Sequence, residues 1–204
     1  MILVVCAVAA ELRGYMREGI DVVAVGVGPV EAAIGTVRAL QAGHYALVIN
    51  AGIGGGFADC ARVGDAVAVT DERYVELGRE DAGELRLPGG TLLETSISAD
   101  AAMLERCRAA KSPVVFGRGV TSATITTTAA RAASLVARFA PAVEAMEGFA
   151  VLRAAAAAGV PALEVRGISN IVGDRAASGW DFRAGSAAAV NALDALLAVV
   201  AGTQ

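Results

Sequence analysis

The sequence lacks several features that would mark a specialised class of protein. Its 204 residues carry a net charge of −4 and no cluster of lysine and arginine, whereas binding to a phosphate backbone requires concentrated positive charge on one face. The three cysteines are widely spaced and form no CxxC pattern, so neither a disulfide framework nor a zinc site is indicated. We expect no nucleic-acid partner, no metal and a reducing, cytoplasmic location.

Signals for membranes and for bound dinucleotides are missing too. No apolar run reaches membrane-spanning length. A secretory signal would have a basic segment before its apolar region, and the apolar residues 1–10 have none. The glycine-rich residues 26–31 and 52–57 both lack the third glycine of GxGxxG, and GxxxxGK[ST] does not occur. We therefore expect no membrane partner, and dinucleotide-binding and P-loop sites are disfavoured.

The apolar patterns predict one α/β domain spanning residues 1–204. A hydrophobic content of 55% is enough for one sizeable core. Short valine-rich runs predict buried strands, and amphipathic or alanine-rich runs predict helices, which alternate as in α/β folds. The predicted strands are residues 2–8, 21–27, 46–51, 64–70, 112–123 (one or two strands), 142–145 and 160–168, and the predicted helices are residues 30–40, 129–139, 148–158 and about 185–201.

Two connecting segments are predicted to be irregular. Residues 52–56 are expected to form a glycine-rich loop in which the backbone can approach a ligand. Residues 72–98 are more polar, and the Pro-Gly-Gly sequence at residues 88–90 predicts a hairpin or loop there.

Polar residues follow two of the predicted strands and suggest a binding site. Glu147 follows the strand at 142–145, with Met146 and Phe149 beside it, and Asn170 follows the strand at 160–168. Ligand-contacting groups in open α/β sheets lie at the carboxyl ends of strands. A carboxylate can accept hydrogen bonds from paired ribose hydroxyls while a thioether and an aromatic ring cover apolar faces, and an amide suits a base edge. The pattern favours a nucleoside ligand.

These segments and three others, in the same order, resemble the purine nucleoside phosphorylase/nucleosidase family, and within it the methylthioadenosine/adenosylhomocysteine nucleosidases and futalosine hydrolases. The matching segments span nearly the whole chain and are residues 10–11, 50–55, 64–65, 146–147 and 166–170. The resemblance implies a central twisted mixed sheet flanked by helices, a small nucleoside substrate, no cofactor, and a homo-oligomer, with a dimer favoured.

The same resemblance assigns roles to individual residues. Glu11 corresponds to the glutamate that accepts a proton from the attacking water, and Glu147 to the one that holds the sugar hydroxyls. Gly55 matches a substrate-contacting glycine, and Thr124 and Ile125 fall where a loop contacts the base. Each residue also has a plain structural alternative: a solvated or helix-starting glutamate, or a packed loop residue.

Asn170 departs from the adenine-specific nucleosidases, in which an aspartate occupies the equivalent place. An amide can donate an N–H to N7 or O6 and accept from a base N–H, so it suits a 6-oxopurine such as hypoxanthine. The alternatives are a loop asparagine that satisfies turn backbone and a nearby acid, Asp174, that protonates the base.

The expected nucleophile is water. Phosphorolysis needs a cationic anchor for the incoming dianion, and the places where the family's phosphorylases carry arginine hold residues 9–11 and 49–51, which include Glu11. The resulting prediction is hydrolysis of futalosine to hypoxanthine and dehypoxanthinyl futalosine in menaquinone biosynthesis. The alternatives are a methylthioadenosine/adenosylhomocysteine nucleosidase, an inosine-type phosphorylase and a catalytically silent nucleoside-binding module.

Futalosine carries an aromatic carboxylate on its 5′ side, which would need a cationic partner. Arg118 and Arg183 are candidates for this partner. Trp180 and Phe182 could form a wall on the same side or an oligomer interface, and His44, the only histidine, is expected to be structural.

Overall fold

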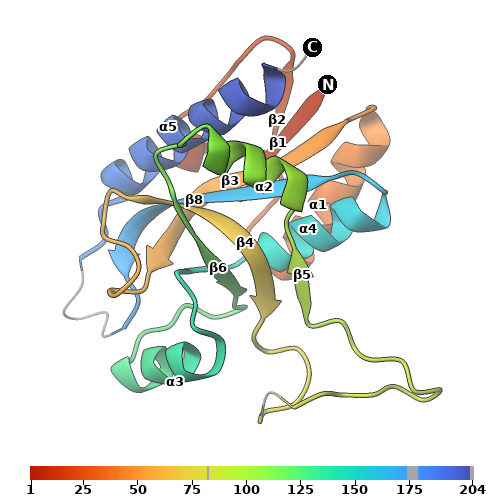
Figure 1. Ribbon diagram of the computed structural model, residues 1–204, viewed down its shortest axis with the longest axis vertical. Coiled ribbons are helices and arrows are strands. Elements are labelled where there is room, and N and C mark those ends of the chain that lie inside the picture. Colours follow the sequence, from red (N-terminus) through yellow and green to blue (C-terminus); the bar gives the residue numbers. More distant parts are fainter. Residues whose placement is uncertain (82, 174–178, 203–204) are drawn as a thin grey trace.

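In the computed structural model, which describes residues 1–81, 83–173 and 179–202, eight strands form one mixed sheet with helices on both faces (Figure 1). The strands are β1 (Ile2–Cys6), β2 (Ile20–Ala24), β3 (Leu47–Gly56), β4 (Ala66–Tyr74), β5 (Ser96–Ser98), β6 (Val115–Thr121), β7 (Val143–Ala145) and β8 (Ala162–Ile171). The helices are the short 3-10 helix η1 (Ala9–Leu12) and the α-helices α1 (Pro29–Ala42), α2 (Ala101–Ala109), α3 (Ala129–Phe139), α4 (Gly148–Ala157) and α5 (Phe182–Ala201).

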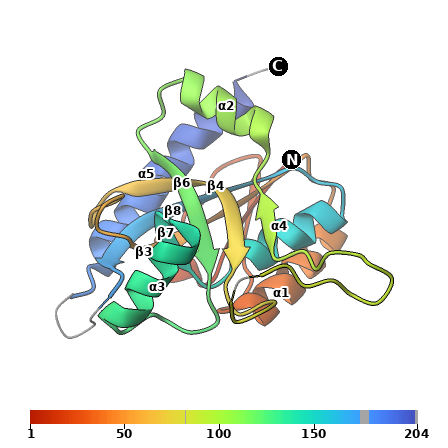
Figure 2. The ribbon, with the colours of Figure 1, turned by 60° about the horizontal axis from the view of Figure 1, so that its bottom comes forward.

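Five of the strands close on themselves. β3 pairs with β7, β7 with β6, β6 with β4 and β4 with β8, and β8 then pairs with β3 along nearly its whole length. The parallel strands β1 and β2 extend the sheet beyond β3, and β5 adds an antiparallel edge to β4. The sheet therefore combines an open part with a closed ring (Figure 2), and closure removes exposed edges from the strands involved.

Helices cover both faces because each contributes one apolar side. α5 lies along β8 and β3 on one face, with α2 beside it, and α4 packs on the other face with α1 alongside (Figures 1 and 2). The largest core cluster joins β1, β3 and β8 to α4 and α5 and includes Leu3, Ile49, Leu152, Leu163 and Leu193, each at most 1% exposed. Burying such side chains contributes about 1.5–3 kcal/mol each.

Helix α5 corrects one sequence-based prediction. By length and composition it is long and apolar enough to cross a membrane, although no run of that length was expected. A core helix passes the same test, and the inner face of α5, including Ala189, Leu193 and Leu197, is fully buried against the sheet.

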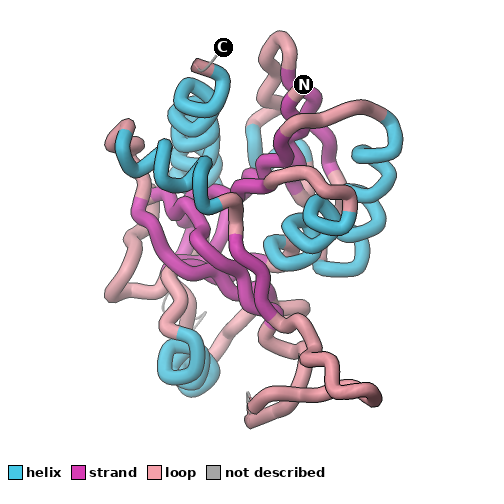
Figure 3. The backbone as a smooth tube through the Cα atoms, turned by 45° about the vertical axis from the view of Figure 1, so that its right-hand side comes forward, coloured by secondary structure: helices cyan, strands magenta, loops and turns pink. Residues whose placement is uncertain are grey.

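A long arm projects from the body between β4 and β5 (Figure 3). Its two sides pair at an isolated antiparallel bridge between Arg86 and Leu92, and Gly89 and Gly90 have positive φ angles of 94° and 88° at its tip. The predicted hairpin at residues 88–90 is thus confirmed. Leu85, Leu87 and Leu92 are 38–42% exposed on the arm.

The structure changes several of the predicted elements. Residues 52–56 were predicted to be a loop, but they continue β3, because β8 pairs with all five of them and β7 pairs with Gly55 and Gly56 on the other side. β8 runs on to Ile171, so Asn170 lies inside the strand. α2 was not assigned from sequence, although Asp100 caps it by accepting a hydrogen bond from the Met103 N–H, at 2.8 Å.

Candidate active site

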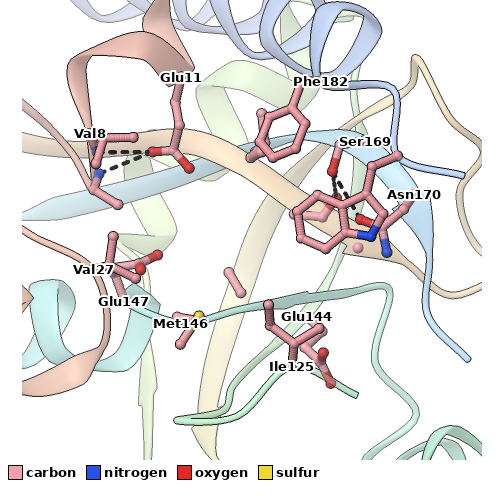
Figure 4. Close-up of a pocket in the computed structure, with 16 residues that line it drawn as sticks. Val8, Glu11, Val27, Ile125, Glu144, Met146, Glu147, Ser169, Asn170 and Phe182 are labelled. Carbon is pink, nitrogen blue, oxygen red and sulfur yellow. Dashed lines mark hydrogen bonds between the residues drawn. The ribbon is translucent and has the colours of Figure 1, made fainter. Parts of the chain in front are cut away.

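A cavity of about 240 Å³ lies beside the C-terminal halves of β3 and β8, where β7 leads into α4. Figure 4 shows Glu11 and Glu147 on one side of it and Ser169 and Asn170 on the other. Its lining comes from seven parts of the chain: Ala7, Val8, Glu11, Val27, Ile53, Gly54, Gly55, Ile125, Glu144, Ala145, Met146, Glu147, Ser169, Asn170, Trp180 and Phe182. Mostly apolar walls with a few convergent polar groups are typical of small-molecule sites.

Glu11 lies in η1, directly after β1, with its side chain 9% exposed. Its Oε2 accepts backbone N–H groups from Ala7 at 3.1 Å and from Val8 at 3.5 Å, which fixes the carboxylate and leaves Oε1 for a ligand. Burial raises the pKa of Glu11 above its usual range, and the nearby Arg166 opposes this shift. A fixed carboxylate with a raised pKa is suited to accept a proton from water.

Glu147 is the residue before the first turn of α4 and is 4% exposed. Its Oε1 accepts the Gly28 N–H at 3.1 Å, and its Oε2 accepts from Arg166 Nη1 at 3.3 Å. Gly28 lies at the start of α1, so Glu147 joins the N-termini of two helices, where negative charge is stabilised. Each oxygen keeps a second acceptor position for a ligand hydroxyl.

Arg166 connects the acidic groups from beneath the cavity. The side chain is fully buried on β8 and forms ion pairs with Glu147 at 3.3 Å and with Glu164 at 2.8 Å. Burial alone would lower the pKa of Arg166, but the Glu164, Glu147 and Glu11 carboxylates raise it overall. Arg166 therefore stays charged and orients Glu147.

Asn170 enters the cavity because β8 contains a bulge. Gly54 pairs with Ile168 and Gly55 with Asn170, so Ser169 is an extra residue in the ladder. A bulge re-aims side chains, and here Ser169 and Asn170, although adjacent, both line the cavity. The Ser169 hydroxyl donates to Asn170 Oδ1 at 2.9 Å, which orients the amide and leaves Nδ2 as a donor toward a ligand (Figure 4).

Glycines in β3 make room for these side chains. A Cβ on Gly52 would lie 2.9 Å from both Arg166 Nη1 and Glu11 Oε2, and one on Gly55 would lie 3.2 Å from Asn170 Nδ2. The glycine-rich segment therefore serves the site as a strand over which polar side chains from neighbouring elements pass.

Replacing Gly52 with alanine is expected to lower kcat on the order of 10²-fold, because a displacement near 1 Å at a reacting group has that effect. The added methyl group would push Glu11 and Arg166 apart. Steady-state kinetics on the purified variant would measure the decrease in kcat. Gly179→Ala is a matched control, because a Cβ there meets nothing within 4 Å. Equal activity in the two variants would contradict the close packing around Gly52.

The structure brings most of the predicted site residues together. Glu11, Gly55, Ile125, Met146, Glu147 and Asn170 all line the cavity. Trp180 and Phe182, predicted to form a wall, also line it, with ring centroids 5.1 Å apart.

Two predicted substrate contacts lie outside the lining. Thr124 is exposed, and its backbone is tied to the Ser122 hydroxyl, which donates to the Thr124 carbonyl at 2.6 Å. Phe149 is buried in the first turn of α4, where its ring packs against Tyr74 with centroids 5.7 Å apart. Neither residue therefore lines the cavity.

Other site residues were missed from sequence. Ser169 lies within a segment that was singled out, but its role depends on the bulge. Glu144 lines the cavity and accepts hydrogen bonds from the Thr126 N–H, at 2.9 Å, and the Thr126 hydroxyl. This holds the loop that carries Ile125. The presence of a glutamate in the short, otherwise apolar strand predicted at 142–145 could have indicated Glu144 as a site residue.

The candidate cations for a substrate carboxylate do not reach the cavity. Arg118 was proposed from sequence, but it forms an ion pair with Asp71 at 2.7 Å and donates to the Phe139 carbonyl at 2.8 Å. Arg183 is exposed and is not part of the lining. Asp174, the alternative acid, falls outside the described residues. Within the part of the chain that the structure describes, no group of three or more His, Cys, Asp or Glu side chains could hold a metal.

Residues 12–202 match the sequence profile of the phosphorylase superfamily, so the chain belongs to that superfamily. Among its relatives, the futalosine hydrolase of Streptomyces coelicolor is 43% identical over 192 residues, covering 91% of this chain and 81% of that protein. The futalosine hydrolase of Acidothermus cellulolyticus is 36% identical over 167 residues, covering 79% and 68%. The family resemblance and the enzyme class, a nucleosidase or N-glycosyl hydrolase, are confirmed.

Solved structures confirm the predicted fold. A methylthioadenosine/adenosylhomocysteine nucleosidase from Neisseria meningitidis, in complex with methylthio-immucillin-A, superposes with a TM-score of 0.82 at 17% identity over 96% of this chain and 97% of that one. The futalosine hydrolase of Helicobacter pylori superposes with a TM-score of 0.80 at 16% identity over 96% of each chain.

Proposed function

We propose that this protein hydrolyses the N-glycosidic bond of futalosine and releases hypoxanthine and dehypoxanthinyl futalosine. The observation that carries the proposal is the convergence of Glu11, Glu147 and Asn170 on one cavity, with two carboxylates on one side and an amide on the other (Figure 4). Similarity to futalosine hydrolases over most of the chain supports this substrate.

The three side chains match the three requirements of the reaction. Cleavage of a glycosidic bond passes through an oxocarbenium-like state. Glu147 holds the ribose hydroxyls and Glu11 orients water against the anomeric carbon, so both place negative charge near the developing cation. The C–N bond breaks with its electron pair going to the base, the water oxygen bonds to the anomeric carbon, and Glu11 takes the proton of that water.

Asn170 stabilises the departing base. Its Nδ2 donates to N7 or O6 of hypoxanthine while Ser169 holds its Oδ1. An amide does not supply a proton, so the base leaves as an anion stabilised by hydrogen bonding and is then protonated by solvent. Trp180 and Phe182 offer apolar ring faces for the aromatic 5′ group of futalosine.

The electrostatics of the cavity favour water over phosphate as the nucleophile. Among the described residues, the lining contains three glutamates and neither arginine nor lysine. Arg166 lies below the cavity, where it is fully buried and already forms ion pairs with Glu147 and Glu164. An incoming dianion would therefore meet negative charge without an anchoring cation.

A substrate panel tests the function. The purified protein would be incubated with futalosine, inosine and methylthioadenosine, each with and without phosphate, and the base and sugar products identified by chromatography. Hypoxanthine from futalosine, with no need for phosphate, is the expected result. Adenine as the main product would point to a methylthioadenosine/adenosylhomocysteine nucleosidase, ribose 1-phosphate from inosine to a phosphorylase, and binding without turnover to a silent nucleoside-binding module.

Exchanging Asn170 for aspartate should shift base preference away from hypoxanthine. An ionised aspartate facing O6 leaves two acceptors opposed, which costs roughly 1–3 kcal/mol, or about 10- to 100-fold in kcat/KM. The measurement is kcat/KM for futalosine and for methylthioadenosine in wild type and variant. An unchanged ratio of the two would show that Asn170 does not contact the base. Asn191→Asp on α5, outside the lining, is a matched control.

We further propose that the protein is a single cytoplasmic domain that acts as a homo-oligomer, most simply a dimer, in menaquinone biosynthesis, without nucleic-acid or membrane partners. The described strands all belong to one sheet, and the exposed leucines of the arm provide apolar surface for a second copy. Light scattering coupled to size-exclusion chromatography would test the oligomer.

A further inference from the structure

A second pair of acidic side chains lies beneath the cavity, and the reaction does not use it directly. Glu72 on β4 and Glu164 on β8 are both 0% exposed. A Cβ built on Gly148, the first residue of α4, would lie 2.6 Å from both Glu72 Oε1 and Glu164 Oε2. These two oxygens therefore border the same space over Gly148, and neither has a hydrogen-bond partner among the described residues.

The space for Glu72 is built into the fold. Gly119 on β6 and Gly148 leave the room that the Glu72 carboxyl fills, because a Cβ at either position would collide with it. Two glycines around one acidic side chain, with three strands and a helix converging there, indicate a specific site for the group.

Hydrogen-bond directions assign a proton to Glu72. The Phe149 N–H donates to Thr121 Oγ1 at 2.7 Å, and the Thr121 hydroxyl donates to Glu72 Oε2 at 2.7 Å. Because Glu72 Oε2 is an acceptor, a proton on Glu72 resides on Oε1, which faces Glu164 Oε2. An O–H donated from Glu72 to Glu164 would satisfy both unpartnered oxygens at once.

The surrounding charges require such a proton. Glu164 and Glu147 form ion pairs with Arg166, and Glu11 lies close to it, whereas Glu72 forms no ion pair in the described part of the chain. A fully buried carboxylate without a cation is costly, and it remains neutral instead. Burial and the facing Glu164, with a smaller effect of Asp71, raise the pKa of Glu72 well above its usual range, although Thr121 and Arg166 oppose this.

We propose that Glu72 is a protonated positioning residue that donates a hydrogen bond to Glu164 and thereby holds Arg166 and Glu147 in register beneath the ribose. Glu72 is connected to the start of α4 by two routes. Through Thr121, Glu72 fixes the Phe149 N–H, and through Glu164 and Arg166 it fixes the Glu147 carboxylate two residues earlier. The catalytic part of this inference rests on the proposed function, and the protonation does not.

Two isosteric variants distinguish this arrangement from a pair of ionised carboxylates. In Glu72→Gln, the amide oxygen accepts from Thr121 and the NH₂ donates to Glu164, so kcat/KM for futalosine should change by less than about threefold. In Glu164→Gln, an amide donor faces the Glu72 O–H and Arg166 loses an anionic partner, so kcat/KM should fall about 10- to 100-fold. Equal losses in the two folded variants would overturn the proposal.

A measurement without substrate decides the protonation by itself. The infrared spectrum of the wild type at pH 7 should contain a protonated-carboxyl C=O band that is lost in Glu72→Gln and, as a second variant, in Glu72→Met. Glu105→Gln, at an exposed position on α2, should keep it. Absence of the band from the wild type, or its persistence in both Glu72 variants, would sink the idea whether or not futalosine is hydrolysed.

The pH dependence of the unfolding free energy is a second test of the proton on Glu72. A carboxyl group whose folded-state pKa is raised stabilises the fold below its unfolded pKa, and this stability is lost as the pH rises through the folded value. Wild-type unfolding free energy should therefore decrease relative to Glu72→Gln on going from acidic to alkaline pH. A constant difference between the two proteins would contradict a protonated Glu72.

Discussion

Replacing Glu11 with glutamine is expected to lower kcat for futalosine by about 10²–10⁴-fold, the usual contribution of a general base. The amide oxygen of glutamine can still accept the Ala7 and Val8 N–H groups, so the fold and KM should change little. Glutamine cannot accept a proton from water. Steady-state kinetics with product chromatography would measure the loss, with Glu105→Gln on the surface of α2 as the control.

The pH profile gives the same prediction a second test. Burial raises the pKa of Glu11, so its carboxylate is protonated at a higher pH than an ordinary glutamate. Wild-type kcat/KM should therefore fall on acidification before the pH reaches the usual glutamate range. The residual activity of Glu11→Gln should lack this limb. If the variant kept full activity with an unchanged acid limb, another group would be the base.

Replacing Arg166 with methionine is expected to destabilise the protein by about 3–5 kcal/mol, the range for removing one partner of a buried ion pair. Methionine fills much of the space of the side chain but leaves Glu164, fully buried, and Glu147, 4% exposed, without their cation. Activity should fall as well, because Glu147 loses the group that orients it. Urea unfolding followed by circular dichroism would measure the free energy.

The matched control is Arg17→Met. Arg17 forms an ion pair with Asp194 at 3.2 Å at the surface, and exposed pairs contribute little to stability because solvent screens them. Similar unfolding curves for the two arginine variants would show that the buried carboxyls are neutral without Arg166, which would overturn the charge balance described around it.

Much of the architecture could be predicted from local patterns. The apolar runs at 2–8 and 142–145 and the helices at 129–139 and 148–158 match elements of the structure within a few residues. Short-range periodicity indicates which face of an element is buried, and that signal needs no knowledge of its neighbours. Ring closure could not be predicted this way, because it depends on β8 pairing with both β3 and β4, which are far from it in the sequence.

Glu72 illustrates the limit most clearly. From sequence it belongs to a polar, irregular stretch, whereas in the structure it is a fully buried residue of β4. Its burial depends on Gly119, Gly148, Thr121 and Glu164, which lie on two other strands and a helix. No local pattern signals that a charged residue will meet such partners.

The sequence by itself determined the residue types available for chemistry and their order: Glu11 after the first strand, Glu147 before a helix and Asn170 near the end of another strand. It also determined that no basic cluster is present. Only the tertiary structure decided that these groups share one cavity, that a bulge at Ser169 turns Asn170 into it, and that Arg166 is buried in ion pairs with two carboxylates. The physical reason is that hydrogen-bond register, burial and charge balance arise between segments distant in the chain, whereas periodicity and composition act within a segment.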